Sequence, residues 1–353
     1  MSPRLKRFLS FLFIALSITA VILIAFGSND LSNIRNAFRQ MNYWWLAGIF
    51  GCWCIYTFFD GMNYWCYLRR QGFSVSIGRA LNFALIGFYY SNITPSAAGG
   101  QPMQVHSMRK AGIPVGYGTM SVTIRFITNQ TMISLISFVL FLLNREFVYR
   151  QLGDAVWFVR FGWVVNFSAV PVIILSAFKR SWVQKLAEWL IAGLVKIRLI
   201  RNREAVVSKV TGVLDTYHHA FHDLMHSPGQ ILLQFACSTV SLLGLYFTIV
   251  FVYYAFGQSG TPWYHLLTLS SLLYISASAT PLPGASGAQE GGFLLYFRGI
   301  FKENIIGLAL LVWRFFTFYL YLIVGVFTVL LEKLVIRRET QRKKLQNESD
   351  QPS

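Results

Sequence analysis

Long hydrophobic stretches alternate with short polar segments along most of this chain. Six stretches contain at most one charged side chain each: about 8–26, 43–67, 117–143, 157–177, 230–256 and 305–331. An α-helix rises 1.5 Å per residue, so about 20 apolar residues cross the roughly 30 Å hydrocarbon core of a bilayer. The pattern predicts an all-α, polytopic integral membrane protein with about six full spans.

Two shorter apolar segments, 78–93 and 264–280, end in breaks rich in proline and glycine. The breaks read TPSAAGGQP (94–102) and TPLPGASGAQEGG (280–292), and each precedes another short helical stretch. Irregular backbone exposed to lipid leaves N–H and C=O groups unpaired, at a cost of several kcal/mol each. We therefore expect two re-entrant helical hairpins, whose breaks are buried in protein or line a wet cavity.

Composition supports a membrane location. Of the 353 residues, 55% are hydrophobic and 13% are charged, against about 25% charged in an ordinary globular protein. This composition excludes a soluble enzyme, a secreted disulfide scaffold and a disordered chain.

The net charge of +17 is spread unevenly over the polar segments. With the N-terminus inside, the cytoplasmic segments contain 22 of the 31 Lys and Arg, and the external loops contain 6. Because cytoplasmic loops carry the excess of Lys and Arg, this predicts a multi-pass protein of the plasma membrane with both termini in the cytoplasm. The basic segments are expected to contact anionic lipid headgroups, not nucleic acid.

Residues 1–335 form one predicted transmembrane domain with a cytoplasmic, amphipathic helical insert at 179–226. Residues 336–353 are predicted to be a disordered basic tail. The insert places Asp215, His219, His222, Asp223 and His226 on the polar face of a helix. Such spacing can bind zinc, but a solvated face is the simpler interpretation, and we expect neither a metal ion nor a cofactor.

The two halves of the domain, about 43–143 and 230–331, repeat one pattern. In each half a Pro/Gly break is followed by a polar side chain and, 24 residues later, by an arginine: Gln101 precedes Arg125, and Glu290 precedes Arg314. By the charge distribution the first hairpin enters from the cytoplasm and the second from outside. The sequence thus predicts an inverted repeat, an arrangement found in secondary transporters.

Arg125 and Arg314 are the lone charges of the apolar tracts 111–144 and 304–331. An arginine at a membrane centre costs about 2.5 to 3.5 kcal/mol and needs an internal partner or a wet cavity. In one interpretation the two arginines pair with Glu290 and Asp60 as buried ion pairs. In the other they bind an anionic headgroup, most simply a phosphate. Both interpretations can be true in turn, if Glu290 releases an arginine when the substrate arrives.

The breaks offer further candidate groups. Backbone N–H groups at about 98–101 and 286–289, up to Gln289, could bind an anion at the starts of the short helices. Four glycines would permit close backbone approach, or would simply permit tight hairpin packing: Gly99, Gly100, Gly284 and Gly287. Three prolines in the breaks are expected to end helices, where the hairpins could open and close as gates: Pro95, Pro281 and Pro283. Asp60 could couple transport to a proton or cation, or be a snorkelling or Arg-paired carboxylate.

These segments resemble the transmembrane, flippase-like domain of lysylphosphatidylglycerol synthases (the MprF type) over roughly residues 8–335. The resemblance is carried by ITPSAAGGQPMQ (93–104), TPLPGASGAQEGGF (280–293), TIRF (123–126) and VWRF (312–315). It implies a membrane protein that moves or handles a lipid, by analogy with aminoacylated phosphatidylglycerol. Only about 20 residues follow the last predicted span, so we expect this chain to be a stand-alone member that does not aminoacylate lipid.

The chain departs from many of these relatives at Gln104, where they have an arginine; Arg109 or His106 are the candidate substitutes. The leading hypothesis is a flippase-like transporter of an anionic phospholipid or lipid-linked substrate that works by alternating access, with the hairpins as gates. The alternatives are a membrane-embedded lipid-modifying enzyme that uses Glu290 as acid or base, or a scaffold for a separate lipid synthase. A homo-oligomer is also compatible with the sequence.

Overall fold

The computed structural model describes residues 41–178 and 221–349, and the single positions 19, 39, 211, 212, 216 and 219. Over these residues the chain is helical without a β-strand, apart from one isolated bridge between Arg298 and Phe301. The predicted first span at 8–26 and most of the insert at 179–226 lie outside the described residues. The described helices fall into two series of the same order, and α7 and α8 follow the first series.

The first series consists of α3 (Tyr43–Arg70), α4 (Ile77–Ile93), the 3-10 turn η1 (Pro95–Ala97), α5 (Gly100–Lys110) and α6 (Val115–Leu143). It is followed by α7 (Arg145–Leu152), the 3-10 turn η2 (Gly153–Ala155) and α8 (Val156–Phe178). The second series consists of α11 (Pro228–Ala255), α12 (Trp263–Ala277), the 3-10 turn η3 (Pro283–Ala285), α13 (Ala288–Tyr296) and α14 (Glu303–Arg314). A π-helical turn, η4 (Phe315–Tyr319), joins α14 to α15 (Leu320–Ser349).

Three helical segments in the described part of the chain are long and apolar enough to cross a membrane: Val115–Leu143, Pro228–Ala255 and Glu303–Leu334. Large apolar side chains remain exposed on their outer faces, among them Leu143, Leu232 and Phe327. Exposed apolar surface of this extent is unfavourable in water. The structure therefore describes a helical membrane protein.

Helices α3 and α11 pack against each other in opposite directions. Asn42 N donates to the Ala255 carbonyl at 2.9 Å at one end of the pair, and Arg70 Nη2 donates to Ser227 Oγ at 3.2 Å at the other. Gly244 lets the backbones approach, because a Cβ there would lie 3.1 Å from the Cys52 carbonyl oxygen.

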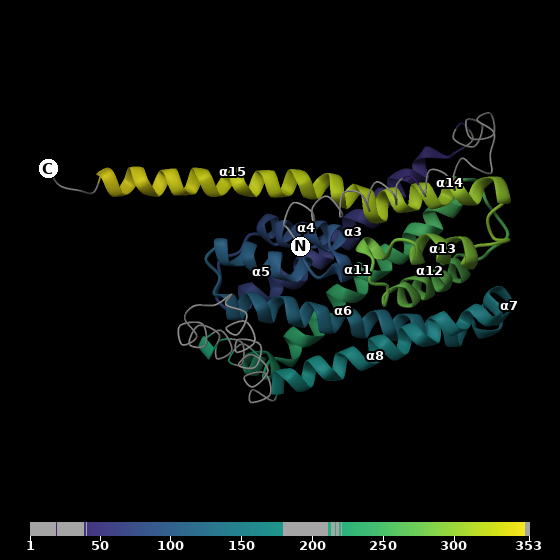
Figure 1. The fold of residues 1–353 in the computed structure, drawn as a ribbon, viewed down its shortest axis with the longest axis horizontal. Helices are drawn as coiled ribbons and strands as arrows, with labels where there is room; N and C mark the ends of the chain where they lie inside the picture. The colour runs from purple at the N-terminus through teal and green to yellow at the C-terminus, as the bar shows by residue number, and fades with distance from the viewer. Residues whose placement is uncertain are drawn as a thin grey trace, which may run out of the picture.

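The segments that contain the two Pro/Gly breaks fold as helical hairpins. In hairpin 1 (77–110), α5 returns along α4, so that a Cβ on Gly100 would meet Ser91 and a Cβ on Gly87 would meet Gln104. In hairpin 2 (263–296), α13 packs on α12, with Gly292 against Leu273. In Figure 1, hairpin 1 (α4 and α5) lies toward the left of the molecule. Hairpin 2 (α12 and α13) lies toward the right, near α7.

The two breaks meet where the hairpins face each other. Ser96 N donates to the Pro281 carbonyl at 2.9 Å. Each break holds residues in the left-handed region of φ: Ser96 at 51° and Ala97 at 54° in the first, Gly284 at 59° and Ala285 at 49° in the second. For residues other than glycine this conformation is unfavourable and persists only where the surrounding structure imposes it.

The C-terminal segment at 336–353 was predicted to be a disordered basic tail. Helix α15 continues to Ser349, through residues predicted to be disordered from 336 onward. The segment is rich in Glu, Lys, Arg, Gln and Leu, which favour helix, and proline first appears at Pro352.

Gly162 on α8 provides a test of the packing between α8 and α12. A Cβ at position 162 would lie 2.3 Å from the Ile275 carbonyl oxygen. Gly162→Ala is therefore expected to destabilise the protein by about 1 to 3 kcal/mol, because backbone cannot move aside for an added methyl group. Thermal unfolding in detergent, followed by tryptophan fluorescence, measures the effect. Gly51→Ala is the control, since a Cβ at Gly51 would meet nothing within 4 Å, and equal midpoints would contradict the close packing.

Candidate functional site

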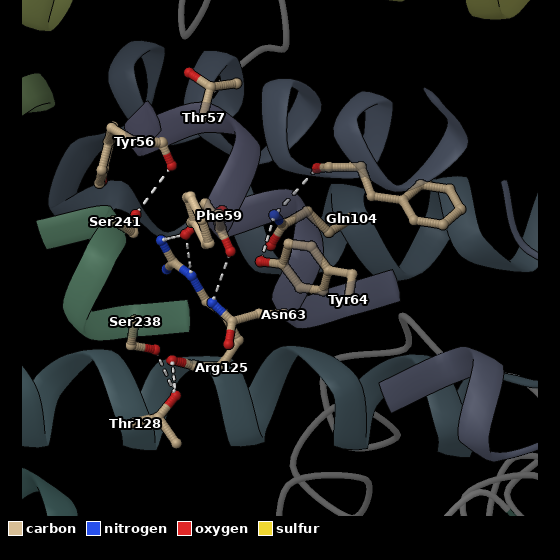
Figure 2. A network of polar contacts seen from close by, with 12 residues as sticks. Tyr56, Thr57, Phe59, Asn63, Tyr64, Gln104, Arg125, Thr128, Ser238 and Ser241 are labelled. Carbon is tan, nitrogen blue, oxygen red and sulfur yellow. Dashed lines mark hydrogen bonds and ion pairs between the residues drawn. The ribbon is translucent and has the colours of Figure 1, made fainter. Parts of the chain in front are cut away.

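Arg125 on α6 forms an ion pair with Asp60 on α3. Arg125 Nε donates to Asp60 Oδ1 at 2.7 Å, and Nη2 contacts the same oxygen. The Asp60 side chain is 2% exposed and that of Arg125 is 18% exposed. Figure 2 shows Arg125 reaching from α6 toward α3, close to Tyr64. Of the interpretations open for Asp60, the Arg-paired carboxylate is the arrangement that the structure contains.

Arg314, the last residue of α14, forms the second buried ion pair. Its Nε donates to Glu290 Oε1 at 2.7 Å, and Nη2 lies 2.5 Å from the same oxygen. The guanidinium also donates to Gln289 Oε1 at 2.9 Å, to Ser286 Oγ at 3.2 Å and to the Gly284 carbonyl at 3.3 Å. Arg314 is thereby bound to the break of hairpin 2 and to the first turn of α13.

The two carboxylates differ in how completely they are bonded. Glu290 Oε1 accepts from Arg314, and Glu290 Oε2 accepts from the Gly287 backbone N–H at 2.6 Å, which closes the first turn of α13. Asp60 Oδ1 accepts from Arg125, whereas Asp60 Oδ2 is buried and has no hydrogen-bond partner in the described part of the chain. An unpaired buried oxygen is costly, so the first pair is the less saturated of the two.

Two neighbouring cavities contain these arginines. The Arg125 cavity, about 340 Å³, is lined by Asp60, Arg125, Gln101 and Gln104 among others. The Arg314 cavity, about 370 Å³, is lined by Arg314, Gln289, Tyr274 and residues of the second break. Both cavities are lined by the same four residues of α4 and η1: Phe88, Ser91, Ser96 and Ala97. The meeting point of the breaks therefore separates them.

Three of the four glycines serve packing. A Cβ on Gly99 would lie 2.6 Å from Thr94 Cγ2, one on Gly100 2.0 Å from Ser91 Oγ, and one on Gly284 2.1 Å from Phe318 Cε2. Side chains of the protein thus occupy the space that close approach of a ligand would need. Gly287 is required for another reason, since its φ of 87° is unfavourable for other residues.

The predicted anion sites at the helix starts are partly filled by the protein itself. Thr94 Oγ1 accepts from the Gly99 N–H at 2.9 Å, and Glu290 accepts from the Gly287 N–H. The prolines are placed close to expectation: α4 ends one residue before Thr94, which precedes Pro95, and Pro283 opens η3. Helix α12, however, ends at Ala277, before Pro281. Pro281 instead joins the two breaks through its carbonyl.

The structural correspondence between the hairpins is shifted by one residue from the predicted one. Counted from the helix caps Gly99 and Gly287, Gln101 corresponds to Gln289 and not to Glu290. Gln289 bonds Arg314, while Gln101 is exposed and lines the Arg125 cavity. The equal spacing of 24 residues in sequence did not reveal this shift.

Gln104, at the position where the family resemblance led us to expect an arginine, fixes hairpin 1 in place. Its Nε2 donates to Tyr64 Oη at 2.9 Å and to the Phe83 carbonyl at 3.1 Å, which ties α5 to α3 and α4 (Figure 2). His106 and Arg109 are exposed and are not among the lining residues of the two cavities. Neither takes the place of the missing arginine in this structure.

Other site residues escaped the sequence reasoning. Phe318 packs against Arg314, with the guanidinium carbon 4.8 Å from the ring centroid, a distance typical of cation–π contact. Tyr64 accepts a hydrogen bond from Gln104, and Ser286 accepts one from Arg314. In sequence they are ordinary members of an apolar run or a loop, and only the tertiary contacts distinguish them.

Comparison with known proteins places this arrangement in a family. Residues 9–325 match the model of the lysylphosphatidylglycerol synthase transmembrane region. The chain belongs to this family. It is also 22% identical over 278 residues to a UPF0104 membrane protein of Archaeoglobus fulgidus, an alignment that covers 73% of this chain and 77% of the archaeal protein. The family match takes in both breaks and both ion pairs.

The histidine-rich segment lies at the edge of the described residues. Asp215 lies outside them, and the rings of His222 and His226 are 4.2 Å apart between centroids. Over the positions that the structure describes, no group of three or more His, Cys, Asp or Glu is arranged to hold a metal ion.

Proposed function

We propose that this chain is a flippase-like transporter that moves an anionic phospholipid or lipid-linked group between leaflets by alternating access. The observation that carries the proposal is the pair of cavities at the meeting point of the two breaks, each lined by one arginine that is paired with a buried carboxylate. A buried guanidinium is costly unless it has a partner. It is also the group best suited to bind a phosphate through two parallel hydrogen bonds.

The proposed membrane arrangement has six spans and two re-entrant hairpins that enter from opposite sides. It is supported by the positions of the hairpins toward opposite ends of the molecule, and by the opposite directions of α3 and α11 (Figure 1). The excess of basic residues in the predicted cytoplasmic segments assigns the α5 end to the cytoplasm, with both termini on that side of the plasma membrane. The two series are then the inverted halves of one repeat.

The breaks are the proposed gates. Ser96 and Pro281 join them through one backbone hydrogen bond, and both contain residues held at positive φ. Strained backbone is common at switch regions, because a small movement relieves it. Separation of the breaks toward one side would connect the Arg125 cavity to that side, and separation toward the other would expose the Arg314 cavity.

Enzymatic use of Glu290 is less well supported. Both of its carboxylate oxygens accept hydrogen bonds, from Arg314 and from the Gly287 N–H. A general acid or base needs an oxygen that can reach the substrate proton. A scaffold for a separate synthase would not require buried charges beside cavities. The transporter accounts for the charges and the cavities together.

Reconstitution tests the proposal. Proteoliposomes are prepared with short-chain fluorescent analogues of phosphatidylglycerol or phosphatidylcholine, and albumin extracts the analogue from the outer leaflet only. The protein is expected to speed the exchange of the anionic analogue between leaflets, well above protein-free vesicles and above the zwitterionic analogue. Absence of any acceleration, or equal acceleration of both analogues, would contradict the proposed transport of anionic lipids.

A further inference from the structure

We infer that Asp60 binds a proton when Arg125 binds the anionic headgroup, so that lipid and proton cross together. The inference rests on the proposed function and names the second substrate of the same site. Its structural basis is the incomplete bonding of Asp60. One carboxylate oxygen pairs with Arg125, and the other is buried without a partner in the described part of the chain.

The surroundings of Asp60 leave Arg125 as its source of positive charge. The titratable and charged groups near it are Tyr56 and Tyr64 on α3, Arg125 on α6 and Tyr321 on α15. Hairpin 1 contributes neutral groups to the lining of the Arg125 cavity, Ser91 and Gln101 among them. Helix α11 contributes Ser241, whose hydroxyl bonds the Tyr56 carbonyl. If Arg125 turns to another anion, the described part of the chain supplies no second cation nearby.

Charge balance then determines the outcome. Before binding, Arg125 and Asp60 together carry no net charge. A phosphodiester headgroup brings one negative charge, and an unpaired carboxylate in a site of low dielectric takes up a proton rather than remain charged. The proton comes from the aqueous solution on the side where the lipid binds, released by hydronium or a protonated buffer molecule, and bonds to a carboxylate oxygen of Asp60. The loaded site is again neutral, with one proton bound for each monoanionic lipid.

The second ion pair does not offer the same exchange. Glu290 keeps a backbone N–H on Oε2 even when Arg314 moves, and Arg314 has three further acceptors in hairpin 2. Arg125 is also more accessible, at 18% exposure against 1% for Arg314. The proton is therefore assigned to Asp60, and Glu290 provides a matched comparison.

Proton uptake on binding is the first test, and it requires no transport. Short-chain phosphatidylglycerol is added to the purified protein in weakly buffered detergent with a pH-indicator dye. The wild type is expected to take up about one proton per lipid bound, by the charge balance above. Asp60→Asn should bind the lipid with no uptake, and Asp60→Glu should restore uptake. Lipid binding without uptake in the wild type, or unchanged uptake in Asp60→Asn, overturns the inference.

A pH gradient provides the second test. In vesicles that are alkaline inside, one-to-one movement of a proton with a monoanion is electroneutral. It should concentrate a fluorescent phosphatidylglycerol tracer in the inner leaflet about tenfold per pH unit. A potassium diffusion potential without a pH gradient should have no effect. Asp60→Asn should lose the accumulation but still exchange labelled for unlabelled phosphatidylglycerol, which shows that the variant is folded.

Glu290→Gln serves as the matched variant. It is expected to slow exchange but to preserve the accumulation ratio set by the pH gradient. Loss of accumulation in Glu290→Gln together with its retention in Asp60→Asn would overturn the assignment to Asp60. Exchange that does not respond to pH would overturn proton coupling and leave the transporter intact. Proton uptake without any exchange would instead refute the transporter and leave the coupled binding site.

Discussion

Arg314→Gln is expected to destabilise the protein by about 3 to 5 kcal/mol, the usual cost of breaking a buried ion pair from one side. Arg314 is 1% exposed and bonds Glu290, Gln289 and Ser286. Its removal leaves the buried Glu290 carboxylate with a single backbone donor. Loss of monodisperse protein on size exclusion and a lower unfolding midpoint in detergent are the measurements.

The double variant Arg314→Gln, Glu290→Gln should recover much of this loss, because two neutral amides can bond each other without a buried charge. Arg160→Gln is the control for loss of an arginine as such. Arg160 is exposed on α8 and donates to Tyr149 Oη at 3.1 Å, and exposed substitutions usually stay within about 0.5 kcal/mol. A double variant no more stable than Arg314→Gln would contradict the coupling of the pair.

Arg125→Gln is expected to slow exchange of the anionic analogue at least about 30-fold while the protein remains folded. The lost charge-assisted phosphate contacts are worth roughly 2 to 5 kcal/mol, and each 1.4 kcal/mol is a factor of ten. Folding should survive because Asp60, which lines a cavity, becomes neutral by taking up a proton. The proteoliposome assay and the unfolding midpoint separate the two effects.

Arg125→Lys should retain only part of the activity, since an ammonium group cannot form the paired bonds of a guanidinium. Arg109→Gln is the matched control. Arg109 is exposed near the end of α5 and is not among the residues that line either cavity. Normal exchange in Arg125→Gln, or an equal loss in Arg109→Gln, would remove Arg125 from the proposed binding site.

Much of the helical layout could be predicted from the sequence, because apolar length and the Pro/Gly breaks act locally. The helices at 43–70, 115–143 and 228–255 follow the predicted stretches closely. The breaks at Pro95 and Pro283 also lie where chain chemistry places them. Helix α15 also extends into the charged tail, because charge excludes a core but not a helix.

The sequence singled out the charged residues of the candidate site but not their pairing. Arg125, Arg314, Asp60 and Glu290 were singled out because charge in an apolar run is costly. Which carboxylate meets which arginine depends on how α3 and hairpin 2 pack, and sequence spacing does not encode that. Spacing instead aligned Glu290 with Gln101, one residue away from the correspondence given by the helix caps.

The π-helical turn at Phe315–Tyr319 has a consequence for how one helix serves two hairpins. A π turn is in effect one extra residue in an α-helix, and one residue corresponds to about 100° of rotation. Before the turn, Arg314 faces hairpin 2; after it, Glu332 bonds Ser107 of hairpin 1. The π turn therefore rotates the side chains that follow it relative to those that precede it. Deletion of one residue from the turn would point either Arg314 or Glu332 away from its partner.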